Sequence, residues 1–301
     1  MTPEPASPHR LKADLALVSI AFIWGATFIL VKEALASVST MLFLTMRFGV
    51  ATIALWFAFR GRGARYPRNL RRELAVGALI GACLFIGYCL QTAGLRYTTA
   101  SKAGFITGFY IVLVPVFNAL IYLRVPHPSE IIGVILATAG MALMTLNSFA
   151  LELAFGDLLV VGCSVAYAFH IILLGHYSGR ISFEALSINQ IAAGAVIGGM
   201  TFWWIEPVRL TWTPAVVIAL AVTSLLATAV AFAVQSWAQQ FTTATRTALI
   251  FSMEPVFALL ASFVLAGEVL TPRAALGAAL ILGGILVVEL KPVRFGAHPS
   301  P

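Results

Sequence analysis

Charged side chains are scarce in this sequence: Asp, Glu, Lys and Arg together make up only 10% of its 301 residues. Soluble domains carry about a quarter charged residues and need them to stay in solution. The low content therefore excludes an ordinary soluble fold. The formal net charge is +7, but the basic residues sit in short pieces between apolar runs and form no basic amphipathic face. A nucleic-acid partner is excluded on that ground.

Cysteine is also rare, with three in the chain. Cys83 and Cys89 lie in one apolar run, nearly on opposite sides of a helix, and Cys163 has no partner nearby in the sequence. We interpret all three as small buried side chains. The sequence also lacks a Gly-rich phosphate loop of the Walker type. Direct coupling to ATP is therefore not expected, and we expect no metal ion and no other cofactor.

Hydrophobic residues, by contrast, make up 60% of the chain, and they gather in runs long enough to cross a bilayer, which takes about 20 residues. Ten such runs are bounded by charge, Pro or Gly, and the links between them are short. They cover residues 14–34, 40–59, 73–95, 99–122, 129–147, 156–176, 183–205, 214–238, 245–266 and 272–290. Residues 1–13 and 291–301 are rich in Pro, Ser and charge and are predicted to be tails. The sequence thus predicts an all-α integral membrane protein with ten transmembrane helices.

The distribution of Lys and Arg predicts the orientation of these spans. With the N-terminus inside, thirteen of the nineteen basic residues fall on the cytoplasmic side, five fall outside, and Arg47 lies within a span. Positive charge stays on the cytoplasmic side of membrane proteins. Both tails and the link from Arg60 to Arg72 are therefore predicted to be cytoplasmic, and the link at residues 148–155 is predicted to be outside.

An internal repeat appears when the sequence is shifted by 144 residues. The run Thr98 to Lys102 then aligns with Thr242 to Arg246, Gln91 with Gln235, Gly133 with Gly277 and Gly140 with Gly284. The two units cover residues 14–147 and 156–290. Each holds five spans, an odd number, so the second unit must enter the membrane in the opposite sense to the first. Two inverted five-helix repeats are typical of alternating-access carriers.

Several motifs in this order resemble one known family. They are Trp24-Gly25 with Phe28 and Lys32, Arg47, the run Leu90 to Pro115, and the stretch Leu249 to Glu268 with Glu254-Pro255 and Gly267-Glu268. Over nearly the whole chain the sequence resembles the drug/metabolite transporter superfamily, in particular its EamA family. The resemblance implies ten helices around a central cavity, an address in the bacterial inner membrane, and a role as an exporter or exchanger of metabolites or amino acids.

Glu254 is the strongest candidate for a functional residue. It lies near the middle of the span 245–266, where a carboxyl is costly and usually faces an aqueous cavity or a partner. Pro255 removes a backbone hydrogen bond and disfavours helical geometry at Glu254, so a local break is predicted there. We predict that Glu254 binds the solute and couples transport to protons. The alternative is a structural carboxyl that a neighbouring hydroxyl satisfies.

Seven further side chains are predicted to line a solute site. Gln91 and Gln235 hold repeat-related places in spans three and eight and should approach each other across the pseudo-two-fold axis; Tyr110 aligns with Glu254 when the shift of 144 is kept without a gap. The others supply aromatic walls or polar groups, which suit a solute with apolar or planar parts. The predicted substrate-binding set is Trp24, Tyr88, Gln91, Tyr110, Tyr167, His170, Gln235 and Glu254. Packing, or hydrogen bonding between helices, is the competing role for each of them.

Other polar residues in the spans receive different interpretations. Arg47 could bind an anionic group, but we interpret it as snorkelling outward to the membrane surface. Lys102 and Arg246 begin repeat-related spans and are interpreted as interfacial anchors. Asn189 and Gln190, early in the span 183–205, are predicted to face the cavity entrance.

The function that these features favour is secondary transport of a small metabolite, amino-acid-like or another small organic solute, by alternating access. A membrane enzyme would need clustered His, Asp or Glu, or a nucleophile beside a base, whereas the spans hold one central carboxylate and one lone histidine. A membrane enzyme, and a channel or receptor without carrier activity, remain the alternatives. The expected partners are the solute, the lipid bilayer and, as a candidate coupling ion, protons; a monomer and a homodimer are both compatible with the sequence.

Overall fold

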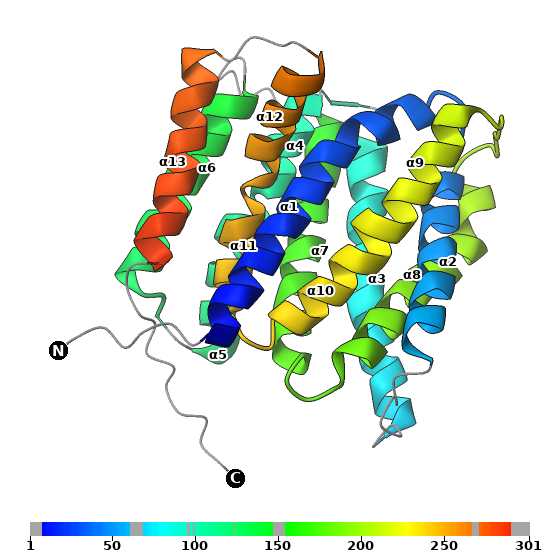
Figure 1. The fold of residues 1–301 in the computed structure, drawn as a ribbon, viewed down its shortest axis with the longest axis horizontal. Coiled ribbons are helices and arrows are strands. Elements are labelled where there is room, and N and C mark those ends of the chain that lie inside the picture. The colour runs from blue at the N-terminus through cyan, green and yellow to red at the C-terminus, as the bar shows by residue number, and fades with distance from the viewer. Residues whose placement is uncertain are drawn as a thin grey trace.

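The computed structural model describes residues 8–60, 69–94, 97–98, 100–123, 125–146, 154–266 and 271–289. Within these ranges the chain is helical apart from short turns and one antiparallel backbone bridge between Val38 and Leu210. Figure 1 shows the elements, which are α1 (Pro8–Ala34), α2 (Thr40–Phe59), α3 (Leu70–Gly94), α4 (Ala100–Gly108), α5 (Tyr110–Tyr122), α6 (Pro128–Thr145), α7 (Phe155–Tyr177), α8 (Phe183–Ile205), α9 (Pro214–Ser224), the π-helical turn η1 (Leu225–Val230), α10 (Ala231–Ala238), α11 (Ala244–Phe251), α12 (Glu254–Ala266) and α13 (Pro272–Glu289). The prediction of an all-helical membrane fold is confirmed.

Each predicted span coincides with one helix or with helices that follow end to end. Eight helical stretches of the described residues are long and apolar enough to cross a membrane; α13 is apolar but shorter. Helix α1 has 27 residues and begins at Pro8, so residues 8–13 are helical rather than part of a tail as predicted. The rest of both predicted tails, most of the Arg60 to Arg72 link and residues 148–153 lie outside the described ranges.

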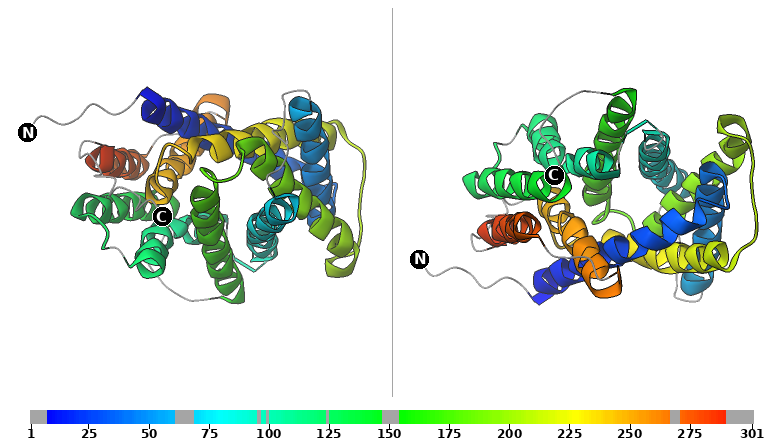
Figure 2. Two further views of the ribbon diagram at one scale, coloured as in Figure 1. Left: turned by 90° about the horizontal axis from the view of Figure 1, so that it is seen from below. Right: turned by 90° about the horizontal axis from the view of Figure 1, so that it is seen from above.

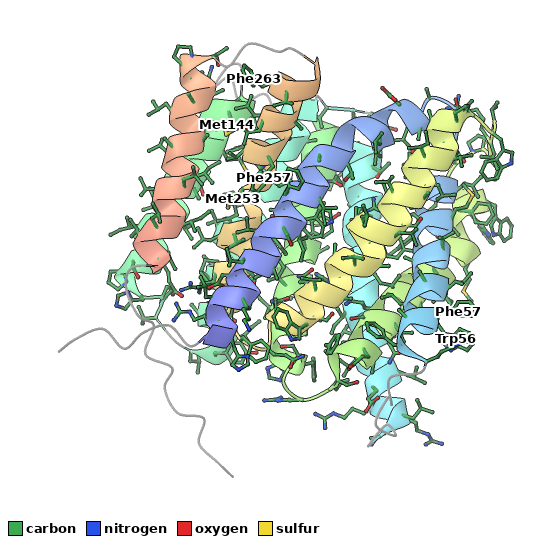
Figure 3. The ribbon with its side chains drawn as sticks, in the orientation of Figure 1. Trp56, Phe57, Met144, Met253, Phe257 and Phe263 are labelled. Atoms are coloured by element: carbon green, nitrogen blue, oxygen red, sulfur yellow. The ribbon has the colours of Figure 1, made fainter. Side chains whose placement is uncertain are left out.

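Large apolar side chains cover the outside of the bundle, as a lipid environment requires. Trp56 and Phe57, near the end of α2, point outward (Figure 3), and Arg60 lies over their rings at 5.4 and 4.7 Å from the ring centroids. Trp203 and Trp204 are exposed at the end of α8, which packs antiparallel to α2. Aromatic side chains therefore mark both ends of the bundle, as they do at the two interfaces of a membrane.

Helices α6 and α13 lie side by side at one edge of the bundle and relate the two repeats (Figures 1 and 2). Glycines bring their backbones together: a Cβ atom on Gly284 would lie 2.6 Å from the Gly133 carbonyl oxygen, and one on Gly277 would lie 2.6 Å from that of Gly140. The shift of 144 pairs Gly133 with Gly277 and Gly140 with Gly284. Gly133 thus contacts Gly284, which is the counterpart of Gly140, and Gly140 contacts Gly277, which is the counterpart of Gly133. This antiparallel pairing is the pattern that a two-fold axis across the two helices produces.

This close contact predicts a position-specific effect on stability. We expect Gly284→Leu to lower the melting temperature of the purified protein by about 2–6 °C, since forcing a side chain into a packed contact costs about 1–3 kcal/mol. The neighbouring Gly283 has no heavy atom within 4 Å of its would-be Cβ. Gly283→Leu should therefore leave the melting temperature unchanged, and equal losses in the two variants would show that this helix contact is not as described.

The fourth span of each repeat is broken at the same place. Helix α4 ends at Gly108 and α5 begins at Tyr110, while α11 ends at Phe251 and α12 begins at Glu254. With the shift of 144, the starts of α5 and α12 coincide, and so do their ends at Tyr122 and Ala266. The predicted break at Glu254 is present, and Pro255 accounts for it because a proline supplies no N–H to the carbonyl of Phe251. The ungapped alignment of Tyr110 with Glu254 agrees with this arrangement.

Candidate functional site

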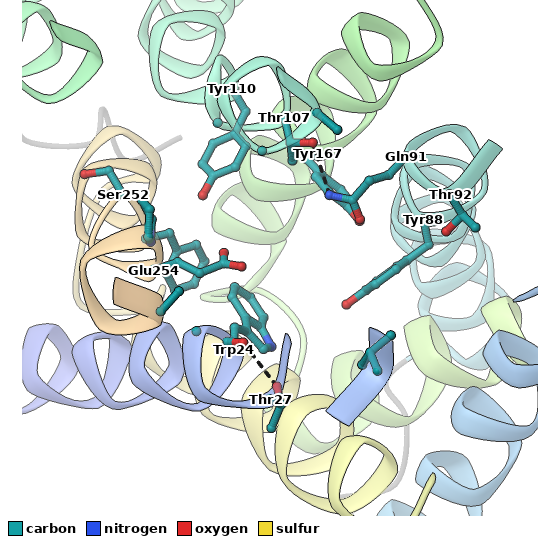
Figure 4. A pocket seen from close by; sticks show the side chains of 18 of the residues that line it. Trp24, Thr27, Tyr88, Gln91, Thr92, Thr107, Tyr110, Tyr167, Ser252 and Glu254 are labelled. Atoms are coloured by element: carbon teal, nitrogen blue, oxygen red, sulfur yellow. Dashed lines mark hydrogen bonds between the residues drawn. The ribbon is translucent and has the colours of Figure 1, made fainter. Parts of the chain in front are cut away.

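A cavity of about 560 Å³ lies in the middle of the bundle, between the two repeats. Its walls come from α1 to α7 and from α10 to α13. All eight side chains of the predicted substrate-binding set lie on this wall, and Figure 4 shows most of them. The volume is within the range of small-molecule sites, roughly 300 to 1,000 Å³. Whether these residues bind the solute stays a prediction.

The cavity reaches one end of the bundle. Lining residues at that end are Leu35 after α1, Thr40 at the start of α2, Thr145 at the end of α6 and Ala274 in the first turn of α13. At the opposite end, all eight residues of α11 are buried, and they pack with the first turns of α1 and with α5. The cavity is therefore open toward one end of the bundle and closed toward the other.

Glu254 is placed where the two halves of the broken helix meet. Its carboxyl group points into the cavity (Figure 4) and makes no hydrogen bond or ion pair with any residue that the structure describes. Gly25 lets α1 pack closely against this position, because a Cβ atom there would lie 2.7 Å from the Glu254 carbonyl oxygen. Among the described residues, no hydroxyl group donates to the Glu254 carboxyl as the structural alternative requires.

Aromatic rings form much of the cavity wall. Tyr167 contacts Tyr88 and Tyr110 edge to face, with ring centroids 5.7 and 6.5 Å apart. On the other side, the Trp24 ring lies 4.9 Å from Phe251 and 5.7 Å from Phe232. Such a surface suits a solute with an apolar or planar part.

A π-helical turn positions two of the lining side chains. In η1 the N–H of Ala231 donates to Leu226 and Thr228 rather than to Ala227, its α-helical acceptor. The Ala227 carbonyl instead accepts hydrogen bonds from Trp24 Nε1 at 2.9 Å and from Arg47 Nη2 at 3.2 Å. Single π-helical turns often occur at functional sites. Nothing in the apolar run 214–238 indicates this turn, so sequence reasoning missed it.

Arg47 does not snorkel, and that interpretation was wrong. Its side chain is buried and lines the cavity. Nε donates to Thr228 Oγ1 at 2.6 Å and Nη2 donates to Tyr88 Oη at 3.3 Å, while the guanidinium lies 5.2 Å from the centroid of the Tyr88 ring. Acceptors inside the bundle hold the charge there, which a hydropathy argument cannot foresee.

The two repeat-related amides both line the cavity, as expected, but they make different hydrogen bonds. Gln91 Nε2 donates to Thr107 Oγ1 at 3.1 Å. Gln235 Nε2 donates to Gln239 Oε1 at 3.1 Å, and Gln239 Nε2 donates to the Ile171 carbonyl at 3.0 Å. Gln235 is buried and its Oε1 atom has no hydrogen-bond partner in the described structure. Gln91 therefore belongs to the half-buried wall, and Gln235 to the closed end.

A buried polar cluster lies beneath the cavity. His170 Nε2 and Gln190 Oε1 are 2.9 Å apart, and Gln190 Nε2 donates to Ser236 Oγ at 3.0 Å. Gln190 is fully buried, and Asn189 donates to the Glu73 carbonyl at 3.3 Å. The prediction that these two residues face the cavity entrance was wrong, because both pack between helices.

Two further polar clusters lie on opposite sides of the cavity. At the closed end, Asp14 accepts from Arg246 Nη2 at 2.8 Å and from Thr242 Oγ1 at 3.2 Å. Arg246 is buried, so the prediction of an interfacial anchor was wrong for it; the Lys102 side chain lies outside the described residues. At the other end, Thr98 Oγ1 donates to Asp157 at 2.5 Å. Asp14 and Asp157 each lie near the start of the first helix of their repeat, a sequence signal that could have revealed both.

In the described ranges, no group of three or more His, Cys, Asp or Glu side chains could hold a metal ion. Among its described residues the cavity wall has one carboxyl side chain, Glu254, one guanidinium side chain, Arg47, and one histidine, His170. The arrangement suits binding of a small organic molecule with an apolar part and a polar group.

Comparisons with known proteins agree with this geometry. A transporter of Archaeoglobus fulgidus, described as uncharacterized, is 35% identical over 282 residues, which cover 94% of this chain and 87% of that protein. The uncharacterized transporter YvbV of Bacillus subtilis is 27% identical over 94% of this chain and 93% of its own length. The inner membrane transporter YedA of Escherichia coli, also uncharacterized, is 25% identical over 94% and 92%.

The fold is also known from a crystal structure. That protein superposes with a TM-score of 0.79 over 93% of this chain and 97% of its own, at 19% sequence identity, a likeness that concerns the fold alone. The model of the EamA-like transporter family matches this chain twice, over residues 11–146 and 154–290. The chain is therefore a membrane transporter that belongs to the EamA-like transporter family.

Proposed function

We propose that this protein is a secondary transporter that moves a small metabolite across the cytoplasmic membrane by alternating access, as an exporter or exchanger. The observation that carries the proposal is a central cavity between two repeats that reaches one end of the bundle and is closed at the other. A channel would need a path through both ends at once. A carrier needs a site that is exposed to one side at a time.

The two aspartate clusters support this mechanism. The shift of 144 relates Thr98 to Thr242, and Asp157 lies one residue from the counterpart of Asp14. The contact of Thr98 with Asp157 thus mirrors that of Thr242 with Asp14, on opposite sides of the cavity. Inverted repeats can exchange their conformations. Both clusters are formed in the present structure. We infer that the Asp14 cluster holds the closed end together here and opens in the inward-facing state.

Glu254 is proposed to couple the cycle to protons. A charged carboxyl is costly inside a membrane, and Glu254 has no basic partner among the described residues, so a proton or a solute must compensate its charge. The cavity gives it access to water from one side at a time. Release of a proton on one side and uptake on the other would then accompany solute movement.

The proposed membrane location and the proposed orientation rest on two observations. The Escherichia coli relative is named as an inner membrane transporter, and the distribution of Lys and Arg favours cytoplasmic termini. We therefore propose a location in the cytoplasmic membrane with both termini inside. In that orientation the present structure is outward-facing.

Counterflow in proteoliposomes tests carrier function. Vesicles loaded with a high concentration of an unlabelled solute should take up the same labelled solute from outside above its equilibrium level for a short time. Only a carrier with a site that alternates between the two sides gives this overshoot. A screen of amino acids and small organic acids, with and without a proton gradient, identifies the solute to use; uptake that rises only to equilibrium would contradict the proposal.

A further inference from the structure

We propose that Arg47 is the anion-binding group of the cavity and that the transported solute carries a carboxylate which binds there. The proposal deepens the proposed transport function and rests on it for its biological meaning. Binding of a carboxylate to the purified protein can nevertheless be measured without any transport assay.

The surroundings of Arg47 leave its charge uncompensated by any acidic side chain. The side chain is 6% exposed and its three hydrogen bonds go to Thr228, Tyr88 and the Ala227 carbonyl, all of them neutral. Within the described part of the chain no Asp or Glu lies within ion-pair distance of it. A buried cation inside a membrane protein is costly and normally has a partner. An anionic ligand that enters the cavity would be that partner.

The hydrogen bonds also aim the guanidinium group. An arginine side chain has five N–H donors in a rigid fork. Nε donates to Thr228, and Nη2 donates to Tyr88 and Ala227, so three donors are used on the protein side. The two N–H groups of Nη1 have no partner among the described residues, and Arg47 lines the cavity. The protein thus fixes the orientation of the guanidinium group and leaves its two Nη1 N–H donors for a ligand.

The number of charges on the wall favours a carboxylate over a phosphate. Arg47 is the single Lys or Arg among the described lining residues. One guanidinium balances one negative charge, whereas a phosphate monoester would bring close to two at neutral pH. The rest of the wall is aromatic, with Tyr88, Tyr167 and Trp24 close to the same space. The geometry therefore points to a carboxylate attached to an apolar or planar body.

Matched probes can separate the carboxylate from the body that carries it. We suggest isothermal titration of the purified protein with 3-phenylpropanoate and with its neutral amide, 3-phenylpropanamide. A second pair, phenylalanine and phenylalaninamide, makes the same comparison with an amine present. The wild type should bind each carboxylate about 10-fold to 100-fold more tightly than its amide, because hydrogen bonds to charged groups are the strong ones.

Variants assign that preference to Arg47. Arg47→Gln should remove the preference, while Arg47→Lys should keep part of it, since lysine retains the charge but loses the fork. Arg180→Gln is the matched control, because it removes one positive charge from an exposed side chain outside the cavity. If Arg47→Gln still prefers carboxylates over amides, or if the wild type shows no preference in either pair, the proposal is wrong.

A test on the wild type does not depend on how a variant folds. Phenylglyoxal modifies guanidinium groups, and mass spectrometry can quantify the modification of Arg47 alone. 3-Phenylpropanoate should slow that modification and 3-phenylpropanamide should not; equal effects would overturn the proposal. Transport assays distinguish failure of this proposal from failure of the transport function. Counterflow of phenylalaninamide but not of the carboxylates would show that the protein is a carrier without a carboxylate subsite at Arg47. Tight carboxylate binding without counterflow of any solute would contradict only the transport function.

Discussion

Replacement of Glu254 by glutamine is expected to reduce accumulation driven by a proton gradient to the background of empty vesicles. Glutamine keeps the size and polarity of the side chain but cannot bind or release a proton. Counterflow of solute against solute should continue, because that exchange need not move a proton. Gradient-driven uptake and counterflow, measured in the same proteoliposomes, check both halves of this expectation. Glu254→Ala should in addition weaken solute binding if the carboxyl contacts the solute.

The competing role of Glu254 is structural support of the helix break at Pro255. That role predicts that Glu254→Gln and Glu254→Ala lower the melting temperature together with transport. Proton coupling predicts a change of less than about 2 °C in Glu254→Gln, or less than about 1 kcal/mol for a chain of this size. Glu184→Gln, which changes an acidic residue in the first turn of α8 outside the cavity, serves as control. Full gradient-driven transport by Glu254→Gln would rule out coupling through this residue.

Asp14→Asn is expected to destabilise the closed end of the cavity strongly. Removing one member of a buried ion pair costs about 3–5 kcal/mol, because the other charge loses its partner. The melting temperature should therefore fall by about 6 °C or more. The double variant Asp14→Asn with Arg246→Gln should recover part of the loss, since it removes both charges. Thermal unfolding of the wild type, both single variants and the double variant gives the coupling between the two sites.

A matched control for this pair lies on the same helix. Glu33→Gln also removes one negative charge from α1, but at an exposed position at its other end. It should change the melting temperature by less than about 1 °C, as surface substitutions usually do. If the double variant is as unstable as the two single losses added together, Asp14 and Arg246 do not stabilise the closed end as a pair.

The helices could be predicted from the sequence because each span must satisfy a simple requirement of length and hydropathy. Spans 40–59, 183–205 and 214–238 match the helices residue for residue. The break before Glu254 followed from Pro255. The matching break after Gly108 has no proline at that place, and only the comparison of the two repeats reveals it. The early start of α1 at Pro8 was missed because its charged first turns look like a tail to a hydropathy scan.

The sequence predicted which side chains line the cavity, and their role in binding the solute stays a prediction; the hydrogen-bond partners of two buried arginines could not be predicted. All eight predicted side chains line the cavity, since a polar or aromatic residue deep in a span has few other uses. The roles of Arg47 and Arg246 were misjudged because their hydrogen-bond partners, Thr228 and Asp14, are far away in the sequence. A charge in a span can snorkel or be held inside, and only the tertiary structure decides which. The π-helical turn that aims Arg47 leaves no mark in the sequence.

Alternating access is tested most directly by the reactivity of two single cysteines toward an impermeant thiol reagent. Thr145→Cys lies at the open end of the cavity and Ala248→Cys lies in the buried closed end; Cys83, Cys89 and Cys163 are first replaced by alanine. In the otherwise unchanged protein, position 145 should react from outside, and position 248 should react slowly from inside. Addition of Asp14→Asn should slow the reaction at 145 and accelerate that at 248, because it favours the inward-facing state. A rise at both positions together, or a change at only one of them, would contradict alternating access.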